Sequence, residues 1–182
     1  HGVAIIATGG RASDTDEYLY RKHPNVTRWH ELEKDPEKLA HAKSVVFIQC
    51  VGSRDENRPY CSRICCTASV SKAISIKEQD PNTDVYILYR EMRTFGEREI
   101  LYKKAREKGV IFIRYSLDNK PTVTESKDGL MVRMFDPILQ KYLLIKADLI
   151  NLATAIESAN NEKLASLYKL PLNEDNFFIL TI

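Results

Sequence analysis

Residues 44–66 read "SVVFIQCVGSRDENRPYCSRICC", and this stretch contains all four cysteines of the chain, Cys50, Cys61, Cys65 and Cys66. It begins with "SVVFIQ", an apolar, β-branched run without polar alternation, which is typical of a strand covered on both faces. A helix is expected to follow, from about Cys61 to Gln79. The stretch therefore predicts a strand, a cysteine-rich turn and a helix in succession.

Two further strand-like runs follow this helix. They are "DVYILYR" at 84–90 and "VIFIRY" at 110–115, and a basic helix at about 96–108 separates them, with Gly109 at its C-terminal cap. A succession of strand, helix, strand, helix and strand implies a parallel sheet with right-handed crossovers. Ligands of open α/β sheets bind beyond the carboxyl ends of the strands, and Cys50 lies at that place on its strand.

The next part of the chain predicts an antiparallel meander. Three short strand-like runs, at 121–126, 129–135 and 142–147, are separated by "KDG" and "DPILQK". "DLINLAT" at 148–154 is expected to be a last buried strand. The fold class is therefore α/β, a Rossmann-like parallel sheet (βαβαβ) with an antiparallel β-meander.

The two ends of the chain carry weaker patterns. "GVAIIATGG" at 2–10 is expected to form a buried strand that ends in a glycine turn. Residues 11–43 are polar and contain two prolines, so they are expected to be loop and linker with a short helix at about 35–42. A short helix at about 160–168 and a strand at 176–182 are expected to end the chain.

The composition fits one globular domain of 182 residues, with 43% hydrophobic and 29% charged residues. A net charge of +2 does not favour nucleic acid as a partner. The apolar runs are far too short for a membrane span, and there is no signal-peptide pattern, so a cytoplasmic location is expected. The chain begins with His1 and runs directly into a strand-like segment, which indicates a piece of something longer.

The cysteine spacing C-x10-C-x3-C-C leaves several chemistries open. If Cys61 opens the helix, Cys61 and Cys65 share one helix face near the positive end of the helix dipole, and Arg54, Arg58 and Arg63 add positive charge. Such surroundings lower the pKa of thiols and suit an anionic, thiolate-bound centre. A [4Fe–4S] cluster tolerates irregular spacing and is favoured. Structural zinc, which usually shows paired C-x2-4-C motifs, a redox disulfide and four unrelated thiols are the alternatives.

The cysteine motif also carries a resemblance to a known family. "QCVGSRDENRPYCSRICC" at 49–66, with "SVSKAISIKE" at 69–78, resembles the signature of the A subunit of heterodisulfide reductase and its relatives, which are iron–sulfur flavoproteins. "GVAIIATGG", "DVYILYREMRTFGERE" and the segment at 147–178 are similar to other parts of the same family. The resemblance covers most of the chain, and its cysteine motif is its most specific part.

This resemblance implies a fold similar to thioredoxin reductase, in which an FAD domain is interrupted by a domain that binds NADPH in the relatives. Residues 1–43 would be a flank of the FAD domain plus a linker, 44–155 the inserted cluster-bearing domain, and 156–182 a return segment towards the FAD domain. Cys50, Cys61, Cys65 and Cys66 would bind a [4Fe–4S] cluster. Four residues would approach FAD, only in the full-length protein: Ala7, Thr8, Gly9 and Gly10.

The function implied by the resemblance is electron transfer. The cluster would exchange electrons with FAD inside a heterodisulfide-reductase-type oxidoreductase, and its partners would be the other subunits of that complex. The isolated fragment would be inactive as an enzyme. The alternative, of a different class, is a non-catalytic structural zinc module that docks partner subunits.

A nicotinamide site is not expected in this domain. A Rossmann turn would place G-x-G-x-x-G after the "SVVFIQ" strand to seat a pyrophosphate, whereas this chain has the cysteine motif there, with the single Gly52. Arg90 and Arg93 follow the third strand, where relatives hold the 2′-phosphate of NADPH. Such arginines more often are solvated or pair with carboxylates such as that of Glu91.

Overall fold

The computed structural model describes residues 2–127 and 129–179 of the chain. It divides into two compact units. The larger unit is Asp14–Ala155 and contains all four cysteines, while the smaller unit combines His1–Ser13 with Ile156–Ile182.

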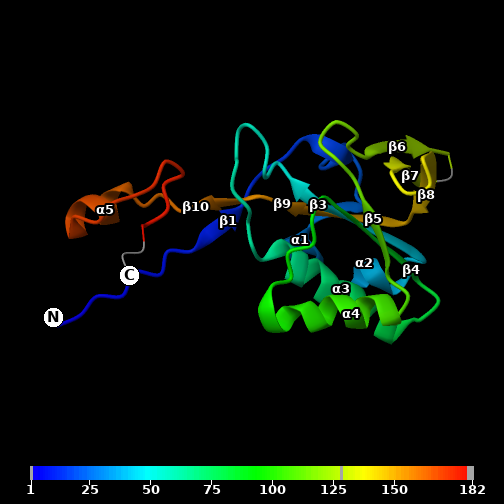
Figure 1. Ribbon diagram of the computed structural model, residues 1–182, viewed down its shortest axis with the longest axis horizontal. Helices are drawn as coiled ribbons and strands as arrows, with labels where there is room; N and C mark the ends of the chain where they lie inside the picture. Colours follow the sequence, from blue (N-terminus) through cyan, green and yellow to red (C-terminus); the bar gives the residue numbers. More distant parts are fainter. Residues whose placement is uncertain (1, 128, 180–182) are drawn as a thin grey trace. The chain divides into compact units, whose positions relative to one another are not determined.

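A five-stranded parallel sheet forms the centre of the larger unit (Figure 1). Its strands in spatial order are β2 (Val26–Arg28), β9 (Leu149–Thr154), β3 (Ser44–Val51), β4 (Asp84–Tyr89) and β5 (Ile111–Arg114), and every neighbouring pair is parallel. Helix α3 (Cys65–Gln79) connects β3 to β4, and η2 (Gly96–Arg98) with α4 (Glu99–Glu107) connects β4 to β5. The predicted βαβαβ unit is therefore confirmed.

The predicted meander is also confirmed. It is a three-stranded antiparallel sheet in the order β6 (Thr122–Ser126), β7 (Gly129–Asp136) and β8 (Lys141–Ala147). The loops between its strands are short, as an antiparallel hairpin requires.

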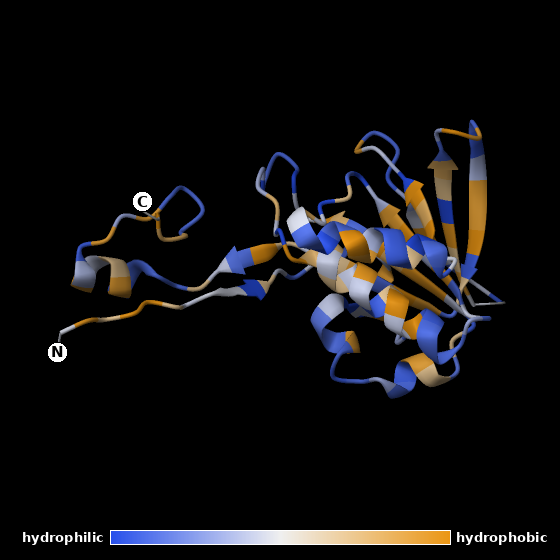
Figure 2. Ribbon diagram, turned by 60° about the horizontal axis from the view of Figure 1, so that its bottom comes forward, coloured by the Kyte–Doolittle hydropathy of each residue, from blue (hydrophilic) through white to orange (hydrophobic). Residues whose placement is uncertain are grey.

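The larger unit has three layers, because both faces of the parallel sheet are covered. On one face, strand residues such as Val46 and Ile48 pack with Val132 and other apolar residues of the meander. On the other face, Phe47 and its neighbours pack with helix residues such as Val70. Figure 2 shows the corresponding hydropathy: the strands are largely hydrophobic, while the helices carry hydrophilic and hydrophobic residues together. Burial on both faces explains why the strand runs show no polar alternation.

The segment at 11–43 contains more regular structure than a loop and linker. The described elements are η1 (Glu17–Leu19), β2, α1 (Trp29–Leu32) and α2 (Glu37–Ala40). The short helix expected at 35–42 is α2, but β2 and α1 were not expected. Both are too short to show a periodic pattern, and β2 is specified by its pairing with β9 rather than by its own residues.

In the smaller unit, β1 (Gly10–Ala12) pairs antiparallel with β10 (Ile156–Ser158), and α5 (Glu162–Tyr168) is the helix expected near 160–168. The buried strand expected at 2–10 is wrong. Residues 2–9 have no regular secondary structure, and Val3 and Ile5 are 85% and 89% exposed. An apolar run becomes a strand only where it finds a pairing partner, and here β10 pairs only from Gly10 onwards.

The strand expected at 176–182 is also not formed where it can be judged. The described part, 176–179, has one isolated bridge, between Leu172 and Phe178, and 180–182 lie outside the described residues. The predicted domain boundaries after residues 43 and 155 stay predictions.

Candidate metal centre

Cys50 lies in a β-bulge close to the end of β3. Its φ is 60°, and the register between β3 and β9 shifts between Ile48 and Val51. A left-handed backbone conformation is uncommon for a residue other than glycine, and such conformations are enriched at functional sites. Gly52, with φ of 62°, then turns the chain, and the Ser53 backbone N–H donates to the Cys50 carbonyl (3.3 Å). The bulge and the turn at Gly52 therefore place Cys50 one residue before the end of the strand.

The loop between Cys50 and Cys61 is closed by its own hydrogen bonds. Ser53 Oγ and the Arg54 backbone N–H both donate to the Tyr60 carbonyl, at 3.1 and 3.2 Å. Asp55 Oδ1 accepts from the backbone N–H groups of Asn57 and Arg58, at 3.0 and 2.9 Å. The closed loop returns the chain to the end of β3, so that Cys61 adds to the rise in the pKa of Cys50 that burial mainly causes.

Helix α3 begins at Cys65, four residues later than expected. Arg63 has φ of 62°, and the Ile64 N–H bonds to the Ser62 carbonyl, so the chain is not helical before this point. Cys61 therefore lies half-buried in the loop, and the expectation that Cys61 and Cys65 share one helix face is wrong.

Cys65 and Cys66 are buried in the first turn of α3. They pack against Ala153 of β9 and against the partly buried Met92, which follows β4. Three parts of the chain that are distant in sequence thus meet here. They are the end of β9, the start of α3 and the segment after β4.

The thiols have unequal pKa values. A hydrogen bond from Cys65 lowers the pKa of Cys66 to about 7, and the Arg93 backbone N–H and the charges of Arg54 and Arg93 act in the same direction against burial. The same hydrogen bond, with burial, raises the pKa of Cys65. Burial raises the pKa of Cys50, and Arg54 opposes this effect. Cys66 is therefore the first of this buried pair to become a thiolate.

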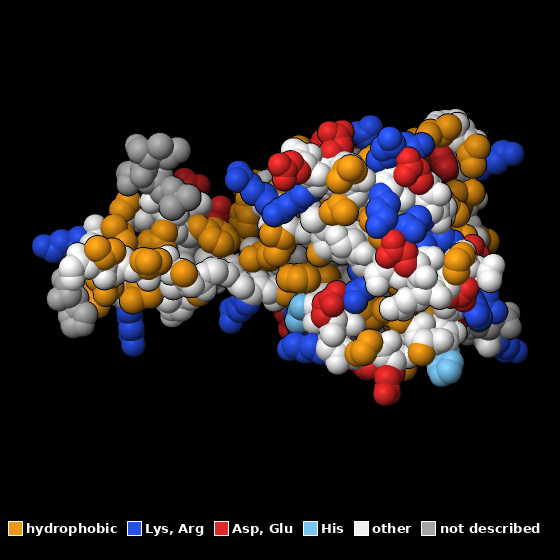
Figure 3. All heavy atoms as spheres, turned by 90° about the horizontal axis from the view of Figure 1, so that it is seen from below, with side chains coloured by type: hydrophobic (Ala, Val, Ile, Leu, Met, Phe, Trp, Pro, Cys, Tyr) orange, Lys and Arg blue, Asp and Glu red, His pale blue; other side chains and the backbone are white. Residues whose placement is uncertain are grey.

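Two backbone N–H groups and an ion-pair network surround the sulfur atoms. The Arg63 N–H donates to Cys61 Sγ (3.4 Å), and the Arg93 N–H donates to Cys66. Glu91 Oε2 accepts from Arg54 Nη2 (2.9 Å) and Arg93 Nη2 (2.8 Å). The site therefore combines hydrogen-bond donors with positive charge partly balanced by one carboxylate. Elsewhere on the larger unit, Figure 3 shows lysine and arginine interspersed with acidic side chains.

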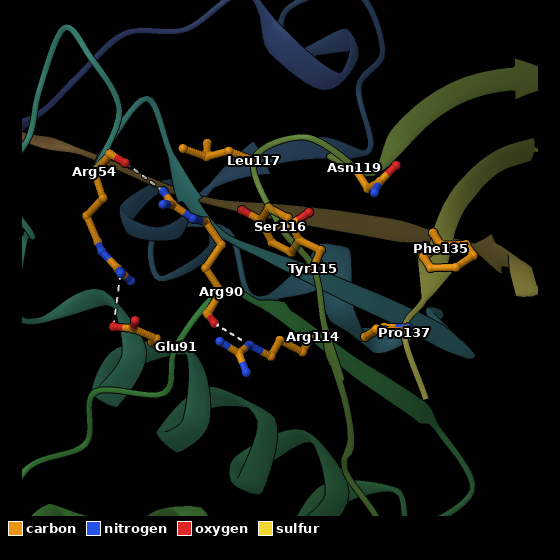
Figure 4. Close-up of a pocket in the computed structure, with 10 residues that line it drawn as sticks. All are labelled: Arg54, Arg90, Glu91, Arg114, Tyr115, Ser116, Leu117, Asn119, Phe135 and Pro137. Atoms are coloured by element: carbon orange, nitrogen blue, oxygen red, sulfur yellow. Dashed lines mark hydrogen bonds and ion pairs between the residues drawn. The ribbon is translucent and has the colours of Figure 1, made fainter. Parts of the chain in front are cut away.

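Beside the cysteine loop, the carboxyl ends of β4 and β5 border a pocket of about 410 Å³ (Figure 4). Arg54, Arg90 and Arg114 line it, together with Tyr115 and Phe135. Arg90 Nη1 donates to the carbonyls of Ser53 (3.3 Å) and Arg54 (2.8 Å). The guanidinium of Arg90 is thus bonded to the backbone of the cysteine loop.

The two arginines that the sequence singled out have different roles. Arg93 pairs with Glu91, which is the ordinary role expected for it. Arg90 pairs with backbone carbonyls, which the sequence did not suggest, because a bond to a carbonyl requires no particular residue type as partner. Arg54 and Glu91 are further residues of the site that the sequence analysis did not combine, since they lie 37 positions apart in the chain.

The donor set fits an iron–sulfur cluster in its chemistry. All four cysteines are free thiols. Near them, Arg54 Nη1 and Thr67 Oγ1 are buried without a hydrogen-bond partner, so the site retains unused polar capacity. Among the described residues, no group of three or more His, Cys, Asp or Glu side chains is arranged to hold a single metal ion.

The residues expected to approach FAD lie in the smaller unit. Ala7 and Thr8 have no regular structure, and Gly9 has φ of 61°. Gly10 opens β1, where an added Cβ would lie 2.5 Å from Ile156 Cγ2 and 2.7 Å from the Glu157 carbonyl oxygen. A close approach of β10 therefore explains the glycine at position 10, and the FAD role of these four residues stays a prediction. No described helix is long and apolar enough to cross a membrane.

Comparison with curated proteins found similar sequences, whereas no family model matches the chain. The chain is 38% identical to the iron-sulfur A subunit of the CoB–CoM heterodisulfide reductase of Methanocaldococcus jannaschii, over 97% of this chain and 30% of that protein. It is 36% identical, with the same coverage, to the A subunit of the H2/formate:CoB–CoM heterodisulfide, ferredoxin reductase of Methanococcus maripaludis. The chain thus spans about 30% of the length of the curated relatives that it matches.

Solved structures share the fold. The thioredoxin reductase of T. acidophilum matches with a TM-score of 0.60 at 12% identity, over 95% of this chain and 50% of that one. The flavoprotein disulfide reductase RclA of Escherichia coli, in its Cu(II) complex, matches with a TM-score of 0.59 at 14% identity, over 96% of this chain and 34% of that one. The predicted similarity to thioredoxin-reductase-like flavoproteins is therefore confirmed at the level of fold.

Proposed function

We propose that this chain, which belongs to the family of heterodisulfide reductase A subunits and corresponds to one segment of such a subunit, is an electron-transfer domain of an oxidoreductase. Cys50, Cys61, Cys65 and Cys66 hold a [4Fe–4S] cluster in this proposal. In the full-length protein the domain exchanges electrons with FAD and works with other subunits of a heterodisulfide-reductase-type complex. The bound cluster supplies a one-electron carrier.

The observation that carries the proposal is the electrostatic interaction that links the four free thiols of the chain, which β3, the loop after it and α3 contribute. Cys50 interacts with Cys61 and Cys66, and Cys65 interacts with the other three cysteines. This proximity requires the bulge at Cys50, the closed loop and the start of α3 together. Unrelated buried thiols would not need these three features.

The surrounding residues would hold thiolates and keep water away. The N–H groups of Arg63 and Arg93 donate to Cys61 and Cys66 and so stabilise negative charge on sulfur. Arg54 is only 13% exposed at its side chain; it opposes the rise that burial causes in the pKa of Cys50, and it helps to lower the pKa of Cys66. Hydrogen bonds to sulfur, net charge and burial are the means by which proteins set the potential of such a centre.

The test is iron and sulfide analysis after anaerobic purification and reconstitution, together with the visible spectrum. Wild-type protein is expected to be brown and to contain iron and acid-labile sulfide. Cys61→Ser and Cys65→Ser are expected to abolish or cripple assembly, while Ser71→Ala, on the exposed side of α3, keeps the wild-type iron content.

Two results would contradict the proposal. Normal iron content in both cysteine variants would show that these thiols are not ligands. A colourless protein that binds zinc through the same cysteines would favour the structural or subunit-docking module instead. The cytoplasmic location expected from the sequence stays a prediction.

A further inference from the structure

We propose that Arg90 is a positioning residue for the candidate centre. Its guanidinium clamps the backbone of the loop that follows Cys50 and so fixes Cys50 and Cys61 relative to the cysteines of α3. The consequence for a bound cluster rests on the proposed function, whereas the clamp itself concerns only the residues of this chain.

The side chain of Arg90 contacts the loop that follows Cys50. Arg90 directly follows β4, and its Nη1 donates to the carbonyls of both Ser53 and Arg54, at 3.3 and 2.8 Å. These two residues come three and four positions after Cys50. Figure 4 shows the Arg90 side chain reaching across to the Arg54 backbone. One planar cation thus bridges two consecutive carbonyl groups, which fixes their direction as well as their distance.

The backbone at Arg90 is held in place by β5. Arg114 Nε donates to the Arg90 carbonyl (3.0 Å), and the Tyr115 N–H donates to the Tyr89 carbonyl (2.9 Å). The ladder between β4 and β5 ends at Tyr89, and the side-chain bond from Arg114 ties the next residue, Arg90, to β5 as well. Because the backbone at Arg90 is held by the sheet, the guanidinium restrains the loop instead of moving with it.

The residues that follow Arg90 contact the cysteines of α3. Cys66 Sγ lies 3.9 Å from the Glu91 carbonyl oxygen, Met92 packs against Cys65 and Cys66, and the Arg93 N–H donates to Cys66. Residues 90–93 therefore bind the loop with one end and the start of α3 with the other. They set the separation between the two halves of the cysteine site.

The loop needs such a clamp because its own hydrogen bonds join residues within the loop and not the loop to the sheet. The bonds from Ser53 and Arg54 to Tyr60 do not fix the loop against the sheet. The Arg90 bonds do so, and the pair between Arg54 and Glu91 provides a second link from the loop to the same segment. Loss of Arg90 is therefore expected to loosen the loop while the sheet stays folded.

The experiment compares Arg90→Met and Arg90→Lys with the wild-type chain, with Arg133→Met as the matched control. Arg133 lies in β7 and stacks over Tyr142, 3.7 Å from the ring centroid. The first readout is hydrogen exchange of the amides at 53–60 in metal-free protein. The second readout, on reconstituted protein, is the rate of iron loss to a chelator and the reduction potential.

In Arg90→Met, the hydrogen-exchange rates of the loop amides are expected to be at least about tenfold higher than in the wild type, while those of the β3 and β4 amides are unchanged. It is also expected to lose iron several-fold faster and to show a shifted potential. Arg90→Lys recovers part of each effect, because an ammonium group can donate to the same carbonyls. Should Arg90→Met fail to fold, Arg90→Ala, which also cannot donate to the carbonyls, provides the comparison.

The outcomes separate the clamp from the cluster. Unchanged exchange of the loop amides in Arg90→Met refutes the clamp, whether or not the protein binds iron. Faster exchange with unchanged iron loss and potential refutes the positioning role. Wild-type protein that takes up no iron after reconstitution refutes the proposed function and the positioning role with it, while the exchange data then still decide whether Arg90 holds the loop.

Discussion

NADPH and NADH are expected not to bind specifically to this domain. The hydrogen bonds of Arg90 allow the loss of affinity to be calculated. Arg90 follows β4, where the resemblance noted in the sequence would place the 2′-phosphate of NADPH, and it lines the pocket at the ends of β4 and β5. Its Nη1, however, already donates to the carbonyls of Ser53 and Arg54. A phosphate that draws this guanidinium away from the loop must break both hydrogen bonds.

The cost follows from those two bonds. Each hydrogen bond to a charged group contributes about 1.5–3 kcal/mol, and the lower end suits the 3.3 Å contact. Giving up both therefore costs about 3 kcal/mol, which weakens binding by roughly 100-fold. A site that would otherwise bind at about 10 μM would bind at about 1 mM. The turn after β3, with Gly52 as its single glycine, offers no compensating cradle of backbone amides for the pyrophosphate.

Isothermal titration calorimetry of metal-free and reconstituted protein is the direct assay. Neither nucleotide is expected to give a saturable heat in the micromolar range with the wild type, with Arg90→Ala or with the control Arg133→Ala. A dissociation constant in the low micromolar range that is lost in Arg90→Ala but kept in Arg133→Ala would refute the reasoning. It would also replace the electron-transfer proposal for this domain with a nicotinamide site.

Two further predictions concern flavin and pH. The chain alone is expected to bind FAD weakly or not at all, because it has "ATGG" at 7–10 but no G-x-G-x-x-G segment; flavin that copurifies in stoichiometric amount would contradict this. Glu31→Gln is expected to lower the free energy of unfolding at pH 7 by less than about 1 kcal/mol. Burial raises the pKa of Glu31, but hydrogen bonds from Tyr20 (2.6 Å) and Arg28 outweigh it, so the pKa lies below its usual value. The difference between variant and wild type in urea unfolding should therefore be full above the usual carboxyl pKa of about 4.3 and disappear as the pH falls through the lower folded pKa; a constant difference would count against this hydrogen-bond network.

The strands buried on both faces were predictable from the sequence, whereas the shortest elements were not. "SVVFIQ" and "DLINLAT" are continuous apolar runs because helices and meander cover the two faces of β3 and β9. β2 has only three residues, and its position depends on β9, which is more than a hundred residues away. The apolar run at 2–10 shows the opposite failure, since a suitable composition does not form a strand where no partner strand pairs with it.

The cysteines of the candidate site were predictable, but their exact placement was not. Their number, proximity and position after a buried strand are visible in the sequence. The left-handed backbone at Arg63, which keeps Cys61 outside α3, is not visible, because arginine has no particular preference for that conformation. The Arg90 clamp is hidden for a related reason, since its partners are backbone carbonyls that any residue could supply.

The positive charge at the carboxyl edge of the sheet suits the proposed role better than a role in nucleotide binding. In a dinucleotide site, such charge faces a mobile phosphate and must remain available to it. Here Arg90 is bonded to two carbonyls, and Arg93 and Arg54 are both paired with Glu91. Arg54 also helps to lower the pKa of Cys66 and opposes the effect of burial on the pKa of Cys50. Charges that are fixed in this way cannot follow a ligand that comes and goes, but they can stabilise negative charge that stays in place. Four thiolates around a permanently bound centre are negative charge of that kind, and the same network that would hinder NADPH would favour them.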